Sequence, residues 1–265
     1  KFIVDGTEAW DANNPARNRG AGAPGLTGED YFSHIFVPHD KVKQAKTDPR
    51  KEEAPRVGEN GSISFVTLDD FNGYPVRFGV YLPYGFDADR KDPYPVLVLM
   101  HGGGGTESSW MNNSMPEIMD NLIAEGRVEP MVVLTPNGNV FHTTGGEGWN
   151  RGPLDDMIIE RVLPYAEAHF NISKDVNKRA FTGLSMGGAT AMSTFLNHPE
   201  AFRYFHAMSA PTTKDIVFDF SNPLLKDRKV MLTVGMYDFV NTYIVNIFPD
   251  TTCWVNAVTI HTSSN

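Results

Sequence analysis

Apolar and polar residues alternate along two neighbouring stretches of the chain, Ser62–Leu68 and Val76–Leu82. Alternation of this kind is typical of strands that bury one face. The dipeptide Asn72-Gly73 between the two stretches favours a tight turn. These residues therefore predict an antiparallel hairpin at the start of a sheet.

Beyond the hairpin, short apolar runs alternate with helix-length segments, as in a parallel sheet with crossover helices. The predicted strands are Val96–Met100, Met131–Thr135, Arg179–Thr182, Tyr204–Ser209 and Val230–Val234. The predicted helices are Met115–Glu125, Leu154–His169 and Met186–Leu196. Since each strand is apolar on both of its faces, we expect all of them to be central, with helices on both faces of the sheet.

The segment before the hairpin has a different character. Residues 1–60 show no sustained periodicity and are rich in Gly, Pro, Asn and charged residues, as in Asn13-Asn14-Pro15. We expect them to form an extended arm that packs on the domain. Residues 61–265 are expected to form one α/β domain, since a chain of 265 residues is long enough for a complete core.

Charge and composition restrict the partners. The formal net charge of -9 and the pI near 5.3 argue against nucleic acid, because binding to a phosphate backbone needs clustered Lys and Arg. The longest apolar run lies around Val96–Met100 and is far shorter than the roughly 20 residues of a membrane-spanning helix. With Cys253 as its single cysteine, the chain forms no internal disulfide. We expect neither nucleic acid nor a membrane as a partner.

The first residue, Lys1, bears on localisation. A start other than Met fits a mature chain after removal of a signal peptide, and it fits a trimmed chain equally well. Secretion is the expectation that we carry forward, with both explanations open.

The motif Gly183-Leu184-Ser185-Met186-Gly187 lies between a predicted strand and a predicted helix. This is the context of the G-x-S-x-G nucleophile elbow, which exposes a reactive serine above the sheet. The turn is so tight that the serine adopts a strained backbone, and the flanking positions must be glycine to avoid clashes. A chance glycine-rich turn is the alternative, but the strand and the helix favour the elbow. Ser185 is therefore the predicted nucleophile.

A second glycine-rich segment, His101–Gly105, directly follows the first predicted parallel strand. Loops of this kind supply one backbone amide of an oxyanion hole, and the residue after the nucleophile supplies the other. We predict that the amides of Gly103 and Met186 bind the oxyanion. Gly102 and Gly104 are expected to lie beside the substrate, because backbone amides approach a ligand closely only where side chains are absent.

The same segment has other interpretations. It could be a flexible connector or a phosphate cradle, although no Lys-Ser/Thr pair of a P-loop follows it. His101 precedes the nucleophile, whereas this fold orders its catalytic residues as serine, acid and histidine. We therefore interpret His101 as a structural residue that ties the loop.

The acid and the base should follow Ser185 in the chain. Asp238 comes shortly after the predicted strand Val230–Val234, at the edge where active-site loops gather, and is the predicted acid. Three rivals precede that strand: Asp215, Asp219 and Asp227. His261 is the only histidine after Asp238, so chain order selects it as the base. His261 lies close to the C-terminus, and His142 in a glycine-rich loop is the other candidate.

Aromatic residues near the expected site are Trp110, Phe141 and Trp149. Trp110 and Trp149 are predicted substrate contacts, because aromatic rings can hold a phenolic acyl group. Packing against the core is the alternative for both residues.

Several segments, in order, resemble one family of enzymes over about residues 74 to 240. The matching segments are Tyr81-Leu82-Pro83, Tyr94–Gly103, Asn121–Gly126, Thr135-Pro136-Asn137, Gly183–Gly188 and Gly235–Asp238. The series is similar to carbohydrate esterase family 1, the feruloyl and acetylxylan esterases, within the wider esterase group that includes esterase D. The resemblance implies an α/β-hydrolase fold, with residues 61–265 as the catalytic domain.

For function, the resemblance implies a secreted enzyme without metal or organic cofactor, which hydrolyses feruloyl or acetyl esters of plant cell-wall xylan. Its substrate would be a small ester or a feruloylated or acetylated oligosaccharide. The tail departs from the family, whose catalytic histidine sits in a Gly-Gly-His-x-Trp segment that is absent around His261. Two alternatives therefore stay open: another acyl or thioester hydrolase of the same fold, and a catalytically impaired binding protein.

Overall fold

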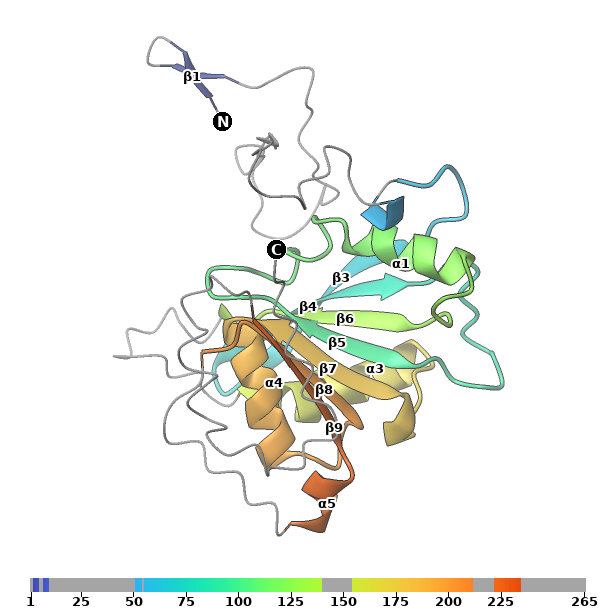
Figure 1. Ribbon diagram of the computed structural model, residues 1–265, viewed down its shortest axis with the longest axis vertical. Helices are drawn as coiled ribbons and strands as arrows, with labels where there is room; N and C mark the ends of the chain where they lie inside the picture. Colours follow the sequence, from blue (N-terminus) through green and yellow to red (C-terminus); the bar gives the residue numbers. More distant parts are fainter. Residues whose placement is uncertain are drawn as a thin grey trace, which may run out of the picture.

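A mixed sheet forms the centre of the protein in the computed structural model (Figure 1), which describes residues 2–4, 7–9, 51–53, 55–139, 154–211 and 222–234. Its strands lie in the order β3-β4-β6-β5-β7-β8-β9. The hairpin is β3 (Ser62–Phe71) and β4 (Tyr74–Leu82). The other strands are β5 (Val96–Met100), β6 (Val132–Pro136), β7 (Arg179–Leu184), β8 (Tyr204–Met208) and β9 (Lys229–Thr233).

Strand direction divides the sheet into two parts. The hairpin is antiparallel, and β4 pairs antiparallel with β6. From β6 to β9, all neighbouring strands are parallel. The structure thus confirms the predicted fold class, a mostly parallel sheet with an antiparallel N-terminal hairpin.

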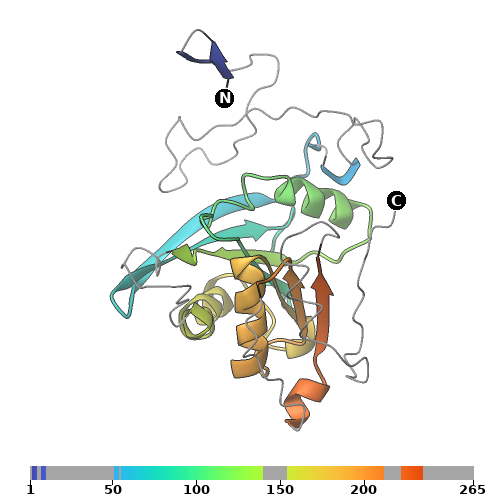
Figure 2. The same cartoon turned by 60° about the vertical axis from the view of Figure 1, so that its left-hand side comes forward.

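Helices cover both faces of the sheet, as Figures 1 and 2 show. Helix α1 (Met115–Ala124) packs on one face. Helix α4 (Met186–Asn197) packs on the other, together with α2 (Leu154–Met157) and α3 (Leu163–His169). Strand β5 contributes to both layers, because Val98 faces the α4 side and Leu99 faces the α1 side. Burial on both faces explains why this strand is apolar throughout.

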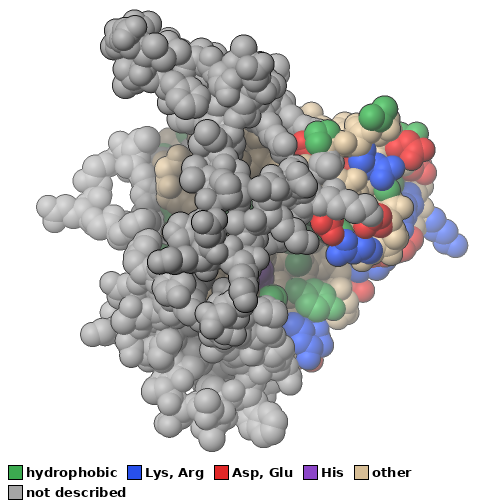
Figure 3. Space-filling view, turned by 45° about the horizontal axis from the view of Figure 1, so that its top comes forward, with side chains coloured by type: hydrophobic (Ala, Val, Ile, Leu, Met, Phe, Trp, Pro, Cys, Tyr) green, Lys and Arg blue, Asp and Glu red, His purple; other side chains and the backbone are tan. Residues whose placement is uncertain are grey.

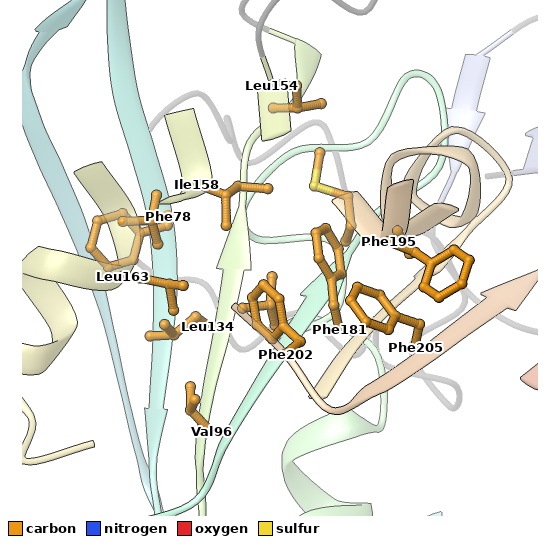
Figure 4. Close-up of a cluster of buried hydrophobic side chains, with 14 of the residues drawn as sticks. Phe78, Val96, Leu134, Leu154, Ile158, Leu163, Phe181, Phe195, Phe202 and Phe205 are labelled. Atoms are coloured by element: carbon orange, nitrogen blue, oxygen red, sulfur yellow. The ribbon is translucent and has the colours of Figure 1, made fainter. Parts of the chain in front are cut away.

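The larger hydrophobic core lies on the α4 side and is rich in aromatic rings (Figure 4). Phe202 lies 5.5 Å from Phe181 and 5.9 Å from Phe205, measured between ring centroids. Phe195 of α4 lies 5.3 Å from Phe205, with the two rings edge to face. Such pairs add to the free energy gained by removing the rings from water, so they fix α4 against β7 and β8.

The predicted helix Leu154–His169 is correct in extent but not in regularity. A π-helical turn, Ile158–Val162, separates α2 from α3, and the Leu163 amide donates to the Ile158 carbonyl. Pro164 explains the interruption, because a proline has no N–H to donate to the carbonyl four residues earlier. The other predicted helices and strands agree with the structure within a few residues at their ends.

The prediction that every parallel strand is central is not met for β9 in the part of the chain that the structure describes. Within the described residues, β9 pairs with β8 alone and forms an edge of the sheet. Val230 and Leu232 are buried, whereas Lys229 and Met231 are exposed. Because Met231 is apolar, the run resembled a strand buried on both faces, although its burial has the period of two that one-sided packing gives.

Residues 1–60 are described only in part. Strands β1 (Phe2–Val4) and β2 (Thr7–Ala9) form a small antiparallel sheet that the sequence did not predict. A 3-10 turn, Lys51–Glu53, lies against α1, where the Asn121 side-chain amide donates to the Glu52 carbonyl over 2.9 Å. The end of the predicted arm thus contacts the domain, and residues 10–50 lie outside the described residues.

A buried carboxyl group anchors α1 on the hairpin. Asp120 Oδ1 accepts hydrogen bonds from the Tyr81 hydroxyl and from the Gly61 amide, each over 2.7 Å. Both Tyr81 and Asp120 are buried. Burial, and then the hydrogen bond to Asp120, raise the pKa of Tyr81 well above its ordinary value of 10.0.

We expect Tyr81→Phe to lower the free energy of unfolding by about 1–2 kcal/mol near neutral pH, because Asp120 loses a buried donor. The pKa of Tyr81 is higher in the folded than in the unfolded state. The stability that this difference contributes is fully present below pH 10 and is lost as pH rises further. The stabilities of wild type and variant should therefore converge above that pH. Urea unfolding across the alkaline range measures both effects, and equal stabilities at neutral pH would contradict the account.

Candidate active site

Ser185 occupies the sharp turn between β7, which ends at Leu184, and α4, which begins at Met186. Its backbone has φ 52° and ψ -113°. The Ser185 amide donates to the Met208 carbonyl over 2.8 Å, and the Ser185 carbonyl accepts from the Ala189 amide over 2.9 Å. A positive φ is costly for a residue with a side chain, so these two bonds hold a strained conformation in place.

Two glycines let three backbone segments meet at this turn. A Cβ atom on Gly183 would lie 2.3 Å from the carbonyl carbon of Gly187. A Cβ on Gly187 would lie 2.5 Å from the Met100 carbonyl oxygen, at the end of β5. Side chains at these positions would force the segments apart. The close approach explains the glycines of the predicted elbow and places Ser185 at the carboxyl edge of the parallel strands.

The glycine-rich loop after β5 lies directly beside Ser185. A Cβ on Gly102 would be 3.5 Å from the Ser185 Cβ. The Gly105 amide donates to the Gly102 carbonyl over 3.0 Å, and Gly104 has a φ of 82°, as the third residue of a type II turn requires. Gly103 and Gly104 are exposed. The structure thus places Gly102 against Ser185, next to Met186, and Gly103 and Gly104 follow Gly102 in the same turn.

His101 holds this loop in place through both of its ring nitrogens. Nε2 lies 3.0 Å from the Gly138 amide nitrogen, and Nδ1 lies 2.7 Å from the Gly102 carbonyl oxygen. Because an amide can only donate, Nε2 accepts, and the ring proton sits on Nδ1 and is donated to Gly102. In a trans peptide the Gly103 N–H points away from that carbonyl, and so away from His101. These contacts support the interpretation of His101 as a structural residue.

His206 on β8 is tied to both neighbouring strands. Its Nδ1 lies 3.2 Å from the Thr182 hydroxyl and its Nε2 lies 2.9 Å from the Thr233 hydroxyl. Burial lowers the pKa of His206 below its ordinary value, which favours the neutral ring at neutral pH. His206 therefore links β7, β8 and β9 and has no ring nitrogen left for a proton relay.

The other described histidines lie on helices. His198 follows the last residue of α4, a 12-residue helix, and so lies about 18 Å along its axis from Ser185. His169 ends α3, where its ring stacks on Tyr165 at 3.9 Å between centroids. Among the residues that the structure describes, no histidine is therefore placed to act as the base for Ser185.

The predicted acid and base, Asp238 and His261, lie outside the described residues, as do Trp149, Asp215, Asp219 and His142. The register of the strands nevertheless shows where the chain leaves β9: Met208 is paired with both Leu184 and Thr233. The segment from Thr233 towards Asp238 therefore starts at the same edge as Ser185. Asp227 lies before β9, at the opposite edge, in an ion pair with Arg203.

Trp110 packs against the smaller core cluster, whose members include Leu99 and Met115. This position agrees with the packing alternative for Trp110. Its predicted contact with substrate stays a prediction.

Two buried polar residues beside the loop carried no predicted role. Glu107 follows the glycine run, and Asn137 directly follows β6 within the segment Thr135-Pro136-Asn137. The Asn137 side-chain amide donates to Glu107 Oε2. The position of Asn137, directly after a parallel strand, could have indicated a role near the site. Nothing in the sequence indicates Glu107 as its partner.

Ser209 was also missed. It follows β8 with a φ of 46°, and its amide donates to the Thr233 carbonyl over 2.7 Å. The preceding residue, Met208, accepts the Ser185 amide. A second strained serine therefore stands next to the elbow, and no sequence pattern indicates it.

The described surface shows charges of both signs. Figure 3 shows basic and acidic side chains interspersed on the described part of one face. In the described residues, no group of three or more His, Cys, Asp or Glu side chains is placed to hold a metal ion. No helix of this part of the chain is long and apolar enough to span a membrane.

A strained serine between a parallel strand and a helix, with a glycine-rich loop of the adjacent strand against it, defines an α/β-hydrolase. The family model described as "Putative esterase" matches residues 72–249. The chain belongs to this esterase family, and the matched part is a carboxylic ester hydrolase domain.

Curated relatives share part of the chain. An endo-1,4-beta-xylanase/feruloyl esterase of Xylanibacter ruminicola is 34% identical over 160 residues, which is 58% of this chain and 22% of that protein. Endo-1,4-beta-xylanase Y of Acetivibrio thermocellus is 31% identical over 161 residues, which is 56% of this chain and 14% of that protein. The chain thus matches less than a quarter of the length of these relatives.

Solved structures share the fold. The feruloyl esterase module from Clostridium thermocellum has a TM-score of 0.62 at 24% identity, covering 76% of each chain. A family 1 ferulic acid esterase from Anaeromyces mucronatus has a TM-score of 0.63 at 21% identity, covering 76% of this chain and 84% of that chain. These likenesses confirm the fold, and the family model confirms the resemblance to the wider esterase group.

We expect Gly103→Val to lower kcat for a small ester by about 100-fold, because a branched side chain would block the approach of the oxyanion to the loop amides. The melting temperature should change little, since Gly103 is exposed. Ser64→Val is a matched control, because Ser64 is exposed on β3, far along the sheet from the elbow. Parallel losses of folding and activity in Gly103→Val would indicate a structural role instead.

Proposed function

We propose that the chain is a serine carboxylesterase that hydrolyses feruloyl or acetyl esters of plant cell-wall xylan through an acyl-enzyme. The observation that carries the proposal is the left-handed backbone of Ser185 between β7 and α4, with Gly102 of the glycine-rich loop against it. That arrangement exposes a hydroxyl group beside backbone amides, which is what acyl transfer requires.

In the first half of the reaction, Ser185 Oγ attacks the ester carbonyl carbon and His261 accepts the hydroxyl proton. Asp238 orients the imidazole and stabilises its cation. The carbonyl oxygen becomes an oxyanion, to which the amides of Gly103 and Met186 donate. Met186 is the first residue of α4, so the positive end of the helix dipole adds to this stabilisation.

Collapse of the tetrahedral intermediate breaks the bond to the alcohol, which leaves with the proton from His261. In the second half, water attacks the acyl carbon and His261 accepts one proton of the water; the bond to Ser185 Oγ then breaks, Oγ takes the proton back from His261, and the carboxylic acid leaves. No metal or organic cofactor takes part in any of these steps.

The substrate class is inferred from named relatives. The Xylanibacter ruminicola relative is named as a xylanase/feruloyl esterase. The Clostridium thermocellum module was solved with sinapinate, and the Anaeromyces mucronatus esterase was solved with ferulic acid. We propose a phenolic or acetyl group on an oligosaccharide as the substrate, with Trp110 and Trp149 lining the acyl site. Since plant cell-wall polymers lie outside cells, the proposed site of action is extracellular.

Ser185→Ala should abolish hydrolysis of methyl ferulate and 4-nitrophenyl acetate, because it removes the attacking oxygen. The fold should be retained, as measured by circular dichroism. Ser193→Ala is the control on the same helix: it removes a hydrogen bond to Asp155 and leaves the elbow intact. A folded Ser185→Ala protein with wild-type turnover would refute the proposal.

His261→Ala should lower kcat by several orders of magnitude, because loss of one member disables the whole proton relay. His142→Ala, measured in parallel, is the discriminating variant. A large loss in His142→Ala with an unchanged rate in His261→Ala would assign the base to His142. A wild-type chain that hydrolyses no oxygen ester or thioester despite an intact elbow would favour the catalytically impaired alternative.

A further inference from the structure

The glycine-rich loop His101–Gly105 is fastened to the end of a neighbouring strand, β6. Four hydrogen bonds connect the two segments, and each involves a different residue after the middle of β6. Gly138 bonds to His101 at the start of the loop, and Asn139 bonds to Gly105 at its end. Thr135 and Asn137 both bond to Glu107, two residues beyond the loop.

Glu107 is almost completely buried, with 1% of its surface exposed. Its backbone carbonyl accepts a hydrogen bond from the Thr135 hydroxyl over 2.6 Å, and its carboxyl Oε2 accepts from the Asn137 side-chain amide. Burying a carboxyl group costs free energy unless it is hydrogen-bonded. The Asn137 amide therefore compensates for the burial of Oε2, while Oε1 is buried without a hydrogen bond to the described residues, and Glu107 in turn fixes the rotamer of Asn137.

Asn137 is fixed by its other polar groups as well. Its backbone amide donates to the Arg77 carbonyl on β4 over 2.9 Å, and its side-chain Oδ1 accepts from the Asn139 amide over 2.9 Å. Asn139 is thereby oriented so that its own side-chain amide donates to the Gly105 carbonyl. One side chain thus connects the buried Glu107 to the turn that presents Gly103.

The segment after Asn137 reaches the other end of the loop. The Gly138 amide donates to His101 Nε2 over 3.0 Å, which fixes the ring that donates to the Gly102 carbonyl. The direction of the Gly102–Gly103 peptide, and so of the Gly103 amide, therefore depends on where residues 137–139 are held.

We propose that Asn137, held by Glu107, is a positioning residue for the oxyanion hole, which sets the location of the Gly103 amide through Asn139 and Gly138. This inference rests on the proposed function, since the amide matters only if an oxyanion forms there. Neither side chain is required to touch the substrate. The pair acts on the transition state through the loop, so its loss lowers kcat far more than it raises KM.

The test exchanges donor and acceptor within the pair. Asn137→Asp has nearly the same shape but places a second carboxyl group against Glu107 and removes the donor. Adding Glu107→Gln restores a donor–acceptor pair with reversed roles, because the amide introduced at position 107 can donate to the carboxyl introduced at position 137. The Asn139 amide keeps its acceptor in both variants.

Two measurements report the effect of the Asn137–Glu107 pair on turnover and on the order of the loop. The first is the kinetics of methyl ferulate and 4-nitrophenyl acetate hydrolysis. The second is hydrogen–deuterium exchange of peptides that cover residues 101–107, which reports the order of the loop whether or not the chain turns over substrate.

Asn197→Asp is the matched control. The Asn197 side-chain amide donates to Asp155 Oδ2 over 2.7 Å, so the substitution disrupts the same kind of carboxyl–amide pair at the far end of α4. It should reduce stability without changing exchange in the loop or kcat.

We expect Asn137→Asp to increase exchange in residues 101–107 and to lower kcat by roughly 100-fold, with KM changed less than about threefold. The double variant should recover both exchange and kcat. If Asn137→Asp is too unstable to purify, Asn139→Ala carries the same expectation for exchange, because it removes the contact with Gly105 alone.

Unchanged exchange in folded Asn137→Asp or Asn139→Ala would overturn the proposal, as would failure of the double variant to recover exchange. A different result would separate the two proposals. If exchange in the wild type and the variants follows the expectation but the chain hydrolyses no ester, the proposed function is overturned and the positioning of the loop is established.

Discussion

The left-handed backbone of Ser185 is the constraint on which the rest of the site depends. It exists because β7 passes into α4 without an intervening loop, and because the Met208 carbonyl on β8 accepts the Ser185 amide. Side chains at Gly183 or Gly187 would collide with backbone atoms, so the turn, the start of α4 and the end of β5 approach one another only with glycine there. The same approach brings the loop after β5 against the nucleophile.

The sheet brings further loops to the edge where Ser185 lies. Parallel strands from β6 to β9 bring all their carboxyl ends to one side, and the loops after β5, β6 and β8 gather there. Aromatic packing of α4 on β7 and β8 holds the helix that carries the elbow, while Tyr81 and Asp120 hold α1 on the opposite face. Packing on both faces of the sheet thus holds the edge that carries the strained backbone of Ser185.

Most of the fold could be predicted because its signals are local. Apolar and polar residues alternate at Ser62–Leu68 because the strand buries one face. The glycines within Gly183–Gly187 are required by the tight turn that contains them. Within the described residues β9 is an edge strand, and this could not be predicted, because Met231 is apolar yet exposed. The partnership of Glu107 with Asn137 joins residues 30 positions apart and has no local signature. Asp238 was selected by its place after the strand Val230–Val234 and His261 by chain order; both lie outside the described residues, so both remain predictions.

We propose that Ser185 is an activated nucleophile beside donors for an oxyanion. A fluorophosphonate probe tests this directly, because it reacts with a serine only where a base and an oxyanion hole assist the attack. Intact-mass measurement followed by peptide mapping should show one probe per chain, attached to the peptide that contains Ser185. A folded chain that remains unlabelled, or that is labelled on another residue, would contradict the account.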